Sequence, residues 1–406
     1  MLILADAVLE APAKLHRPGR LRIKGETILE VGSHLQATPG EEVLDFSGLT
    51  ITPGFINLHA HLDLSSLHGS LIPGKTFADW LRQIIPILPG LTPEVRRHSI
   101  IHSSRKASHS GTTSVLSITS DLSTLAGLNS TSTRVWWALE FMDLHGNPSP
   151  SQNLDRATAW LSRHPATSWH LALSPHAPYT SSPTLYQELG RLASEHHLPF
   201  TTHLGESKEE TDLLFGNTGP LHPLLPPELK REDFCGNTSS VDWCRRHHSL
   251  PSHPILAHLN ELKNSDVDYL AEIQATIVHC PSTHQWFNRP SFQLNLLRAK
   301  QIPVCLGTDS PACSPNLHLD LREEVRLFRQ NNPKITHHEV WEMITSSPAR
   351  ALRIENKLGT LQTGSWADWA GWRIPPDQDP IESILESHGP AEASCVAGRV
   401  NRHDFI

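Results

Sequence analysis

The chain has 406 residues, of which 38% are hydrophobic and 19% charged, and its formal net charge is −8. This composition is typical of a globular protein, and the length predicts one large domain plus a smaller one, or an α/β barrel with an accessory layer. Because phosphates are neutralised by basic side chains, the acidic balance argues against nucleic acid as a partner.

The start of the chain and the pattern of cysteines indicate the cellular location to expect. The opening MLILADAVLEAP is apolar but short, carries Asp6 and lacks a basic leader, so it is a poor signal peptide. No apolar run reaches the ~18–20 residues that a membrane helix needs. The six cysteines are scattered and form no C-x-x-C pair, which is typical of reduced thiols. We expect a cytoplasmic protein without a membrane segment, and a homo-oligomer is left open.

Both ends of the chain have the pattern of short strands. Residues 1–53 contain three alternating, glycine-punctuated stretches, and KLGTLQTGSWADWAGWRI, which starts at residue 357, returns to the same pattern. The tail can pair with the N-terminal strands. We therefore expect a small composite β-sandwich domain made of residues 1–53 and 357–406.

The middle of the chain alternates strand-like and helical stretches. Helical patterns cover, for example, residues 92–111, 182–197 and 320–331. The expected strands are residues 54–62, 112–119, 134–142, 169–176, 199–207, 254–262, 275–282 and 302–310. Eight such alternations predict the α/β class and a (β/α)₈ barrel of the TIM type over residues 54–356. The proline-containing stretch HPLLPPELKREDFCGN, residues 222–237, is an irregular insert and a candidate lid.

The stretch PGFINLHAHLDLS, residues 53–65, places two imidazoles two residues apart in an expected strand. Alternate side chains of a strand share a face, so His59 and His61 point the same way. Two neutral imidazoles on one face can clamp a transition metal. Two surface histidines without a role would give the same pattern, and the chain has 27 histidines.

Further polar groups lie at the ends of other expected strands. The fifth strand carries His203 and then Glu206, the sixth His258 and the eighth Asp309. Each alone has an ordinary explanation, such as a structural histidine or a helix cap. The carboxyl ends of barrel strands open on one face, where active sites lie. Three imidazoles and a carboxylate together suit Zn²⁺ or Fe²⁺ with a position left for water.

These segments resemble the amidohydrolase superfamily, in the branch with cytosine, guanine and adenosine-type deaminases and triazine hydrolases. The resemblance runs from about residue 45 to about residue 370. It is carried by PGFINLHAHLDLS, SPHAPYTSS, THLGESKEE, LAHLNEL, HCPSTH, LGTDSPACSPN and GTLQTGSWADW. It implies the barrel, the composite terminal domain, and a metal at the strand ends.

The resemblance also implies roles for individual residues. It makes His59, His61, His203 and Asp309 the metal ligands, Glu206 the proton shuttle, and His258 the group that holds the attacking water or polarises the target. A second metal in this superfamily usually needs a carboxylated lysine on the fourth strand, and WHLALSPHAPY has none. One divalent ion is expected, with Zn²⁺ ahead of Fe²⁺.

The implied chemistry is hydrolytic removal of an exocyclic amine. A bound metal lowers the pKa of its water from ~15.7 toward ~7. Asp309 would accept the water proton, Glu206 would pass a proton to a ring nitrogen and then to the leaving amine, and His258 would stabilise the developing charge. The products are a ring carbonyl and ammonia. Some triazine chlorohydrolases lack the acid after strand five, so Glu206 favours a deaminase.

The substrate is less determined. His176 matches a substrate-contacting position, and Trp80 could stack on a purine, although tryptophans on helices are more often core. His284 stands where the family often has asparagine, which leaves substrate choice at that edge open. The sequence of the segments FADWLRQII, THLGESKEE and DLREEVRLF is similar to that of a branch linked to aminofutalosine deamination. We expect a small purine-type substrate, aminofutalosine- or adenosine-like.

Other readings stay open. The same scaffold could deaminate guanine or cytosine, hydrolyse a triazine chloride or a cyclic amide, or bind a ligand without catalysis. GSLIPGKT, residues 69–76, matches the phosphate-loop pattern, but it lies in a loop after the H-x-H strand rather than in a βαβ unit. HHE at 337–339 matches part of the base-flipping zinc deaminase signature, but P-C-x-x-C is missing.

Overall fold

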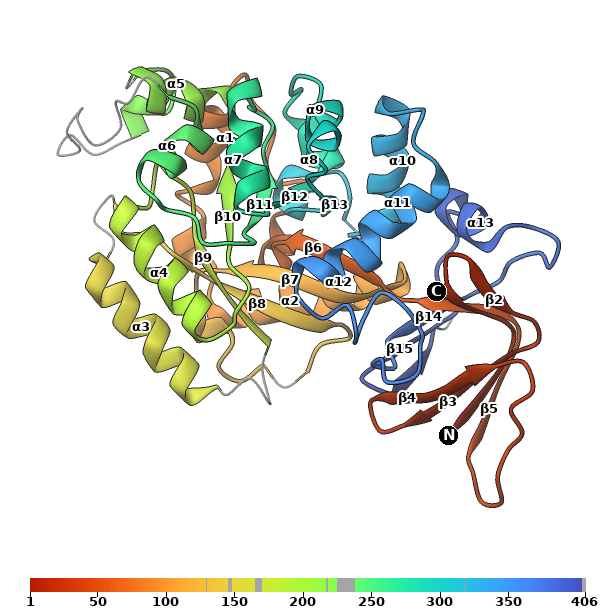
Figure 1. The fold of residues 1–406 in the computed structure, drawn as a ribbon. Helices are drawn as coiled ribbons and strands as arrows, with labels where there is room; N and C mark the ends of the chain where they lie inside the picture. The colour runs from red at the N-terminus through yellow and green to blue at the C-terminus, as the bar shows by residue number, and fades with distance from the viewer. Residues whose placement is uncertain are drawn as a thin grey trace.

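The computed structural model describes residues 1–128, 130–144, 148–164, 170–216, 218–224, 238–317 and 319–403. Figure 1 shows a large α/β unit beside a smaller unit made mainly of strands, which contains both termini. The expected α/β fold, a TIM-type barrel with a small β unit from both ends, is therefore confirmed. The boundaries expected at 53/54 and 356/357 stay a prediction.

The small unit is one continuous sheet in which strands from the two ends of the chain are neighbours. The order is β16-β15-β14-β5-β1-β3-β4, with β2 paired to β1. Its central strand β5 runs parallel to β1 and antiparallel to β14, with Trp369 opposite Pro53. The strands are β1 (Leu2–Ala11), β2 (Lys14–His16), β3 (Gly19–Lys24), β4 (Thr27–Gly32), β5 (Val43–Pro53), β14 (Trp369–Trp372), β15 (Ala393–Val396) and β16 (Arg399–Arg402).

The large unit contains eight parallel strands in two sheets of four. Their orders are β6-β7-β8-β9 and β10-β11-β12-β13. Single parallel bridges close the ring, between Leu173 and Phe200 on one side and between Ala60 and Asp309 on the other. The strands are β6 (Phe55–Ala60), β7 (Thr112–Thr119), β8 (Arg134–Phe141), β9 (His170–Pro175), β10 (Thr201–Leu204), β11 (Ile255–His258), β12 (Thr276–His279) and β13 (Val304–Leu306).

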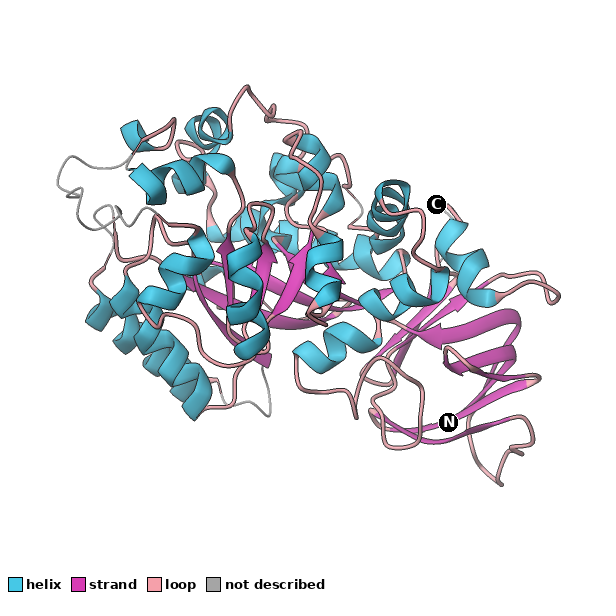
Figure 2. Cartoon of the chain, turned by 45° about the horizontal axis from the view of Figure 1, so that its top comes forward, coloured by secondary structure: helices cyan, strands magenta, loops and turns pink. Residues whose placement is uncertain are grey.

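Helices surround these strands, as Figure 2 shows. Several begin at a Ser, Thr or Asp cap followed by proline, because the cap oxygen accepts a free backbone N–H and proline needs no partner at that position. Thr92 and Ser182 cap helices α2 and α4 in this way. The helices are α1 (Phe77–Ile84), α2 (Pro93–His109), α3 (Pro150–Arg163), α4 (Pro183–Glu195), α5 (Lys208–Gly216), α6 (Ser240–Arg246), α7 (Val267–Glu272), α8 (Pro281–Trp286), α9 (Leu294–Ala299), α10 (Leu321–Asn331), α11 (His337–Ile344), α12 (Ser346–Ala351) and α13 (Pro380–Glu386).

Aromatic packing joins the two units. Trp372 of β14 lies against Phe55 of β6, with ring centroids 5.7 Å apart, and its indole N–H donates to the Thr52 hydroxyl at 3.1 Å. Phe55 also makes an edge contact with Trp341 of α11 at 5.3 Å. Because β5 leads directly into β6, this packing fixes the direction in which the H-x-H strand enters the barrel.

The eight expected barrel strands are all found, and most are shorter than expected. β7 covers residues 112–119 as predicted, whereas β6 ends at Ala60, so His61 follows the strand and precedes a 3₁₀ turn, η1 (Leu62–Leu67). Of the candidate lid at 222–237, residues 222–224 form a short 3₁₀ turn and 225–237 lie outside the described residues.

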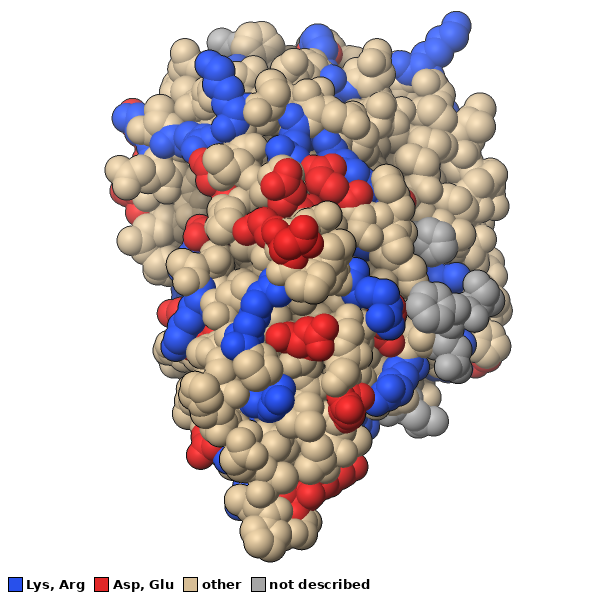
Figure 3. Space-filling view, turned by 90° about the vertical axis from the view of Figure 1, so that its right-hand side faces the viewer, with Lys and Arg blue, Asp and Glu red and all other residues tan. Residues whose placement is uncertain are grey.

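None of the helices in the described ranges combines the length and apolarity needed to cross a bilayer. On the face seen in Figure 3, acidic and basic side chains are intermixed.

Gly307 tests how tightly the last and first barrel strands approach. A Cβ built at this position would lie 2.9 Å from the Cβ and from the carbonyl oxygen of His59, and 2.9 Å from Val278. We expect Gly307→Ala to lower the free energy of unfolding by about 1–3 kcal/mol, as overpacking does. Gly32→Ala is the matched control, because nothing lies within 4 Å of its added Cβ. Denaturant unfolding with equal losses in both variants would refute this reading.

Candidate metal centre and substrate pocket

The first barrel strand is bonded to the segment after the last one. Asn57 of β6 donates to the Thr308 hydroxyl at 2.7 Å and accepts from the Thr308 backbone N–H at 3.2 Å. The His59 carbonyl oxygen accepts the backbone N–H groups of Thr308 and Asp309 at 3.1 and 3.0 Å. These contacts place the side chain of Asp309 beside those of His59 and His61, although Asp309 lies about 250 residues further along the chain.

Asp309 faces both histidines of the H-x-H pair. Its Oδ1 lies 3.5 Å from Nε2 of His59 and 3.5 Å from Nε2 of His61. Burial alone would raise the pKa of this carboxyl, but the hydrogen-bonding contact with His59 and the electrostatic attraction of the nearby imidazoles outweigh burial and hold the pKa well below its usual range. The carboxylate form is therefore present at neutral pH. Cys313 donates its thiol to Oδ2 at 3.6 Å.

His203, at the end of β10, is oriented by the backbone. Its Nδ1 lies 3.1 Å from the carbonyl oxygen of His176, and because a carbonyl only accepts, Nδ1 carries the hydrogen. Its Nε2 then presents a lone pair and lies 3.3 Å from Nε2 of His61. Such a backbone contact is how metal-binding histidines are commonly oriented.

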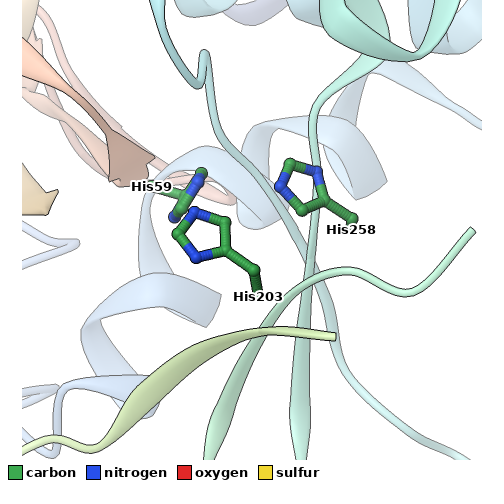
Figure 4. A group of neighbouring side chains, drawn as sticks. All are labelled: His59, His203 and His258. Atoms are coloured by element: carbon green, nitrogen blue, oxygen red, sulfur yellow. The ribbon is translucent and has the colours of Figure 1, made fainter. Parts of the chain in front are cut away.

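His258 completes the group from β11. Its ring stacks on that of His203, with centroids 5.5 Å apart and planes inclined by 21°, and lies 5.3 Å from the ring of His59. Figure 4 shows these three rings converging from separate strands. Burial lowers the pKa of His61 and of His258 to about 3, and holds that of His203 well below its usual range. The imidazoles of His61, His203 and His258 are thus neutral and can act as ligands.

The buried nitrogens of His59 are the observation that fits a metal. The side chain is fully buried, and neither ring nitrogen has a hydrogen-bond partner among the described residues. An unpaired buried polar atom costs about 1–3 kcal/mol. His59, His61 and Asp309 form one group with ligand atoms within 4.8 Å of one another, and His59, His203 and His258 form another. Imidazole and carboxylate donors in this number suit Zn²⁺.

A sharp backbone turn separates Glu206 from His203. Gly205 between them has a φ of +58°, in the left-handed region that glycine adopts most readily. The Glu206 side chain is buried, and burial raises the pKa of its carboxyl to about 8, an effect that Arg289 partly offsets and Asp309 reinforces. This carboxyl holds a proton near neutral pH, as a proton shuttle requires.

A pocket of about 410 Å³ opens beside the cluster and reaches His61. Both Trp80 and His176 line it, and their contact with a substrate stays a prediction. Trp80 also stacks on Phe77, with ring centroids 5.7 Å apart, so it belongs to the core as well. Most of the wall is apolar, with Leu64, Leu81, Ile84, Ile85, Leu88, Ile118, Met142, Leu221 and Leu224 among its residues.

The structure places His284 elsewhere. Among the described residues it lines a separate hollow of about 260 Å³, not the pocket at His61. Its Nδ1 lies 3.0 Å from Oδ1 of Asn260, and Asn260 donates to the carbonyl oxygen of Glu206 at 3.0 Å. The partner of His284 is therefore an asparagine that holds the backbone of the candidate proton shuttle. A substrate contact by His284 stays a prediction.

The profile of the amidohydrolase family matches residues 50–387. This chain belongs to the amidohydrolase family. Among curated relatives, the 5-methylthioadenosine/S-adenosylhomocysteine deaminase of Thermococcus kodakarensis is 28% identical over 85% of this chain and 79% of its own length. The 5′-deoxyadenosine deaminase of Methanobrevibacter smithii is 24% identical over 90% of this chain and 82% of its own length.

Solved structures share the fold of this amidohydrolase. Helicobacter pylori aminofutalosine deaminase, in complex with methylthio-coformycin, has a TM-score of 0.83 at 19% identity, covering 98% of this chain and 99% of its own. An adenosine deaminase from Xanthomonas campestris with bound zinc has a TM-score of 0.80 at 19% identity, with coverage of 98% and 92%. Atrazine chlorohydrolase from Arthrobacter aurescens, complexed with zinc, has a TM-score of 0.83 at 19% identity, with coverage of 98% and 94%.

Sequence reasoning missed several charged residues in the pocket of this amidohydrolase. Glu140 of β8 lines it and is buried, and burial raises the pKa of its carboxyl to about 8. Asp63 and Arg96 also line it and form a buried ion pair at 2.5 Å. The signal for Glu140 was present, because it is the single acid in the otherwise apolar run VWWALEFM.

Metal binding should be measurable as stability. A ligand that binds only the folded state raises its apparent stability, by about 2.7 kcal/mol at a hundredfold excess over its Kd. We expect Zn²⁺ to raise the unfolding midpoint of metal-free protein, and His203→Ala or Asp309→Ala to abolish the rise and the bound metal. His34→Ala, at an exposed histidine, is the control. Stoichiometric zinc retained by both cluster variants would exclude these residues as ligands.

The pKa of Glu206 also predicts a pH dependence of folding. Because the folded-state pKa of about 8 exceeds the ordinary value of 4.5, the folded chain binds an extra proton between these limits. The contribution of Glu206 to the free energy of unfolding is therefore most favourable at a pH below its ordinary pKa, and it declines as the pH rises toward the folded-state pKa. We expect metal-free Glu206→Gln to match the wild type in acid and to be the more stable protein above pH of about 8. A constant difference across the range in urea unfolding would contradict this.

Proposed function

We propose that this amidohydrolase is a zinc-dependent aminohydrolase that replaces the exocyclic amine of an adenine-type nucleoside by a carbonyl and releases ammonia. The observation that carries the proposal is the convergence of the imidazoles of His59, His61, His203 and His258 with the Asp309 carboxylate at the strand ends, beside the buried carboxyl of Glu206. That set combines metal ligands with a proton carrier. The family match and the deaminases among the relatives support the same chemistry.

His59, His61, His203 and Asp309 would hold the ion. A bound zinc would supply Lewis acidity and lower the pKa of the attacking water toward ~7. The zinc-bearing solved structures with this fold support zinc over iron. The absence of a lysine in the fourth-strand segment supports a single ion.

The proton transfers fall to side chains around this set. The ionised carboxylate of Asp309 accepts the proton of the attacking water. Glu206 passes its proton to a ring nitrogen, which prepares the carbon for attack, then takes up the hydroxyl proton of the tetrahedral carbon and delivers it to the leaving amine. The proton held by Asp309 finally restores Glu206. His258, stacked on His203, polarises the group at the reacting carbon. Each transfer of this kind contributes about 10²–10⁴-fold to the rate.

The pocket supports a nucleoside-sized substrate. Its 410 Å³ lies in the range of small-molecule sites, and its largely apolar wall suits a flat ring with an apolar extension. Trp80 would contact the purine face and His176 its polar edge. Methylthioadenosine and 5′-deoxyadenosine, named for the relatives, have such a ring and such an extension. Aminofutalosine is the second candidate, supported by the fold likeness to its deaminase. A cytoplasmic location belongs to this proposal.

Glu206→Gln tests the assigned proton shuttle. The variant keeps the shape of the side chain and cannot give up a proton, so we expect normal zinc content and a loss in turnover of about 10²–10⁴-fold. Ammonia release should be screened over methylthioadenosine, 5′-deoxyadenosine, adenosine, aminofutalosine, guanine and cytosine, with metal measured on the same sample. Full activity of Glu206→Gln would remove this residue from the mechanism. Chloride release from atrazine without ammonia from any amine would replace deamination by dechlorination.

A further inference from the structure

Glu140 is a buried acid without a hydrogen bond. Its residue is 8% exposed, and its buried Oε1 has no hydrogen-bond partner among the described residues. Nδ1 of His203 lies 3.9 Å from Oε1, and that nitrogen already donates to the carbonyl oxygen of His176 at 3.1 Å. The carboxyl therefore has room for a partner that the chain does not supply.

An unpaired buried carboxyl destabilises the folded state. Buried polar side chains are therefore rarely left without a hydrogen-bond partner. By contrast, the buried acid Glu324 accepts hydrogen bonds from Ser282 at 2.7 and 2.6 Å and from Asn316 at 2.8 Å. Glu140 differs from Glu324 in lining the substrate pocket.

The end of the pocket around Glu140 is polar and lacks a free cation. Thr119, Ser120 and Thr180 line it with Glu140. The guanidinium of Arg96 is paired with Asp63 at 2.5 Å and also donates to the carbonyl oxygens of residues 88 and 91 at 3.2 and 3.3 Å. Among the described lining residues, no other Lys or Arg is present. A substrate phosphate or carboxylate would find no counter-ion here, whereas an uncharged hydroxyl would find hydrogen-bonding groups.

We propose that Glu140 binds a hydroxyl group of the substrate, and so selects an uncharged nucleoside over a free base or a nucleotide. The inference rests on the proposed function, and it adds the residue that recognises the sugar side of the molecule. A hydroxyl is both donor and acceptor, so it pairs with the carboxyl in either protonation state. It would replace the hydrogen bond that the folded chain leaves unmade.

A second metal is the competing use of this residue. Glu140, His176 and His203 have ligand atoms within 4.8 Å of one another. The nitrogen of His203 on this side is Nδ1, which carries its hydrogen toward the His176 carbonyl. A protonated nitrogen cannot ligate, so the geometry favours the hydroxyl.

The experiment compares two ligands in three proteins. Zinc-loaded wild type, Glu140→Gln and Glu140→Leu are assayed for ammonia release from adenosine and from 2′,3′-dideoxyadenosine. The wild type should prefer adenosine in kcat/KM by about 10- to 100-fold, the value of a hydrogen bond to a buried group. In Glu140→Leu this preference should fall toward one, while Glu140→Gln, which still bonds a hydroxyl, should keep part of it. The Leu variant should also have a higher unfolding midpoint, because it removes the unpaired buried carboxyl.

Glu324→Gln is the matched control for changing a buried acid. It should lower the unfolding midpoint, since it disturbs bonds made within the chain, and leave the ligand preference unchanged. A preference retained in Glu140→Leu, or absent from the wild type, overturns the inference. Binding of a second zinc ion by the wild type that is lost in Glu140→Leu would also overturn it, because it would assign Glu140 to a metal. If no nucleoside releases ammonia, the proposed function fails, and equilibrium binding of the same two ligands to the same proteins still decides the role of Glu140.

Discussion

The bonding between the first barrel strand and the segment after the last one is the constraint on which the candidate site depends. The carbonyl of His59 accepts two backbone N–H groups from the segment that carries Asp309, and Asn57 ties Thr308 to the same strand. Gly307 permits the approach, because any side chain there would overlap His59. Without this closure, the carboxylate would have no fixed distance to the imidazoles.

Burial then sets the electrostatics of the cluster. Removal from water favours the uncharged form, so the imidazoles of His61, His203 and His258 lose their protons and the Glu206 carboxyl keeps one. Asp309 is the exception, since the surrounding histidines stabilise its charge more than burial opposes it. The result is one base-like carboxylate and one acid-like carboxyl in the same site. Opposed environments of two carboxyls are what divides acid from base roles in an enzyme at neutral pH.

The sequence predicted the barrel and the clustering of strand-end groups, because both follow from local patterns repeated in chain order. The strand pattern located all eight strands, and a parallel barrel brings their carboxyl ends together whatever the loops do. It could not predict contacts that depend on side chains from separate elements. Glu140 has no motif around it, and the Asp63–Arg96 pair joins residues 33 apart through packing alone. The exact ends of strands were also beyond it, as His61 lies just after β6.

His284, which departs from the family pattern, contacts the candidate proton shuttle indirectly, through Asn260. Asn260 must present its amide N–H to the carbonyl of Glu206, which leaves its oxygen facing His284. A histidine with a hydrogen on Nδ1 satisfies that oxygen, so the two side chains form a chain of hydrogen bonds ending at the backbone of the proton carrier. Gly205 turns the same backbone sharply between His203 and Glu206. Two features thus fix the position of Glu206. Gly205 adopts the positive φ of the turn with little strain, and the Asn260 amide, held by His284 of α8, donates to the Glu206 carbonyl.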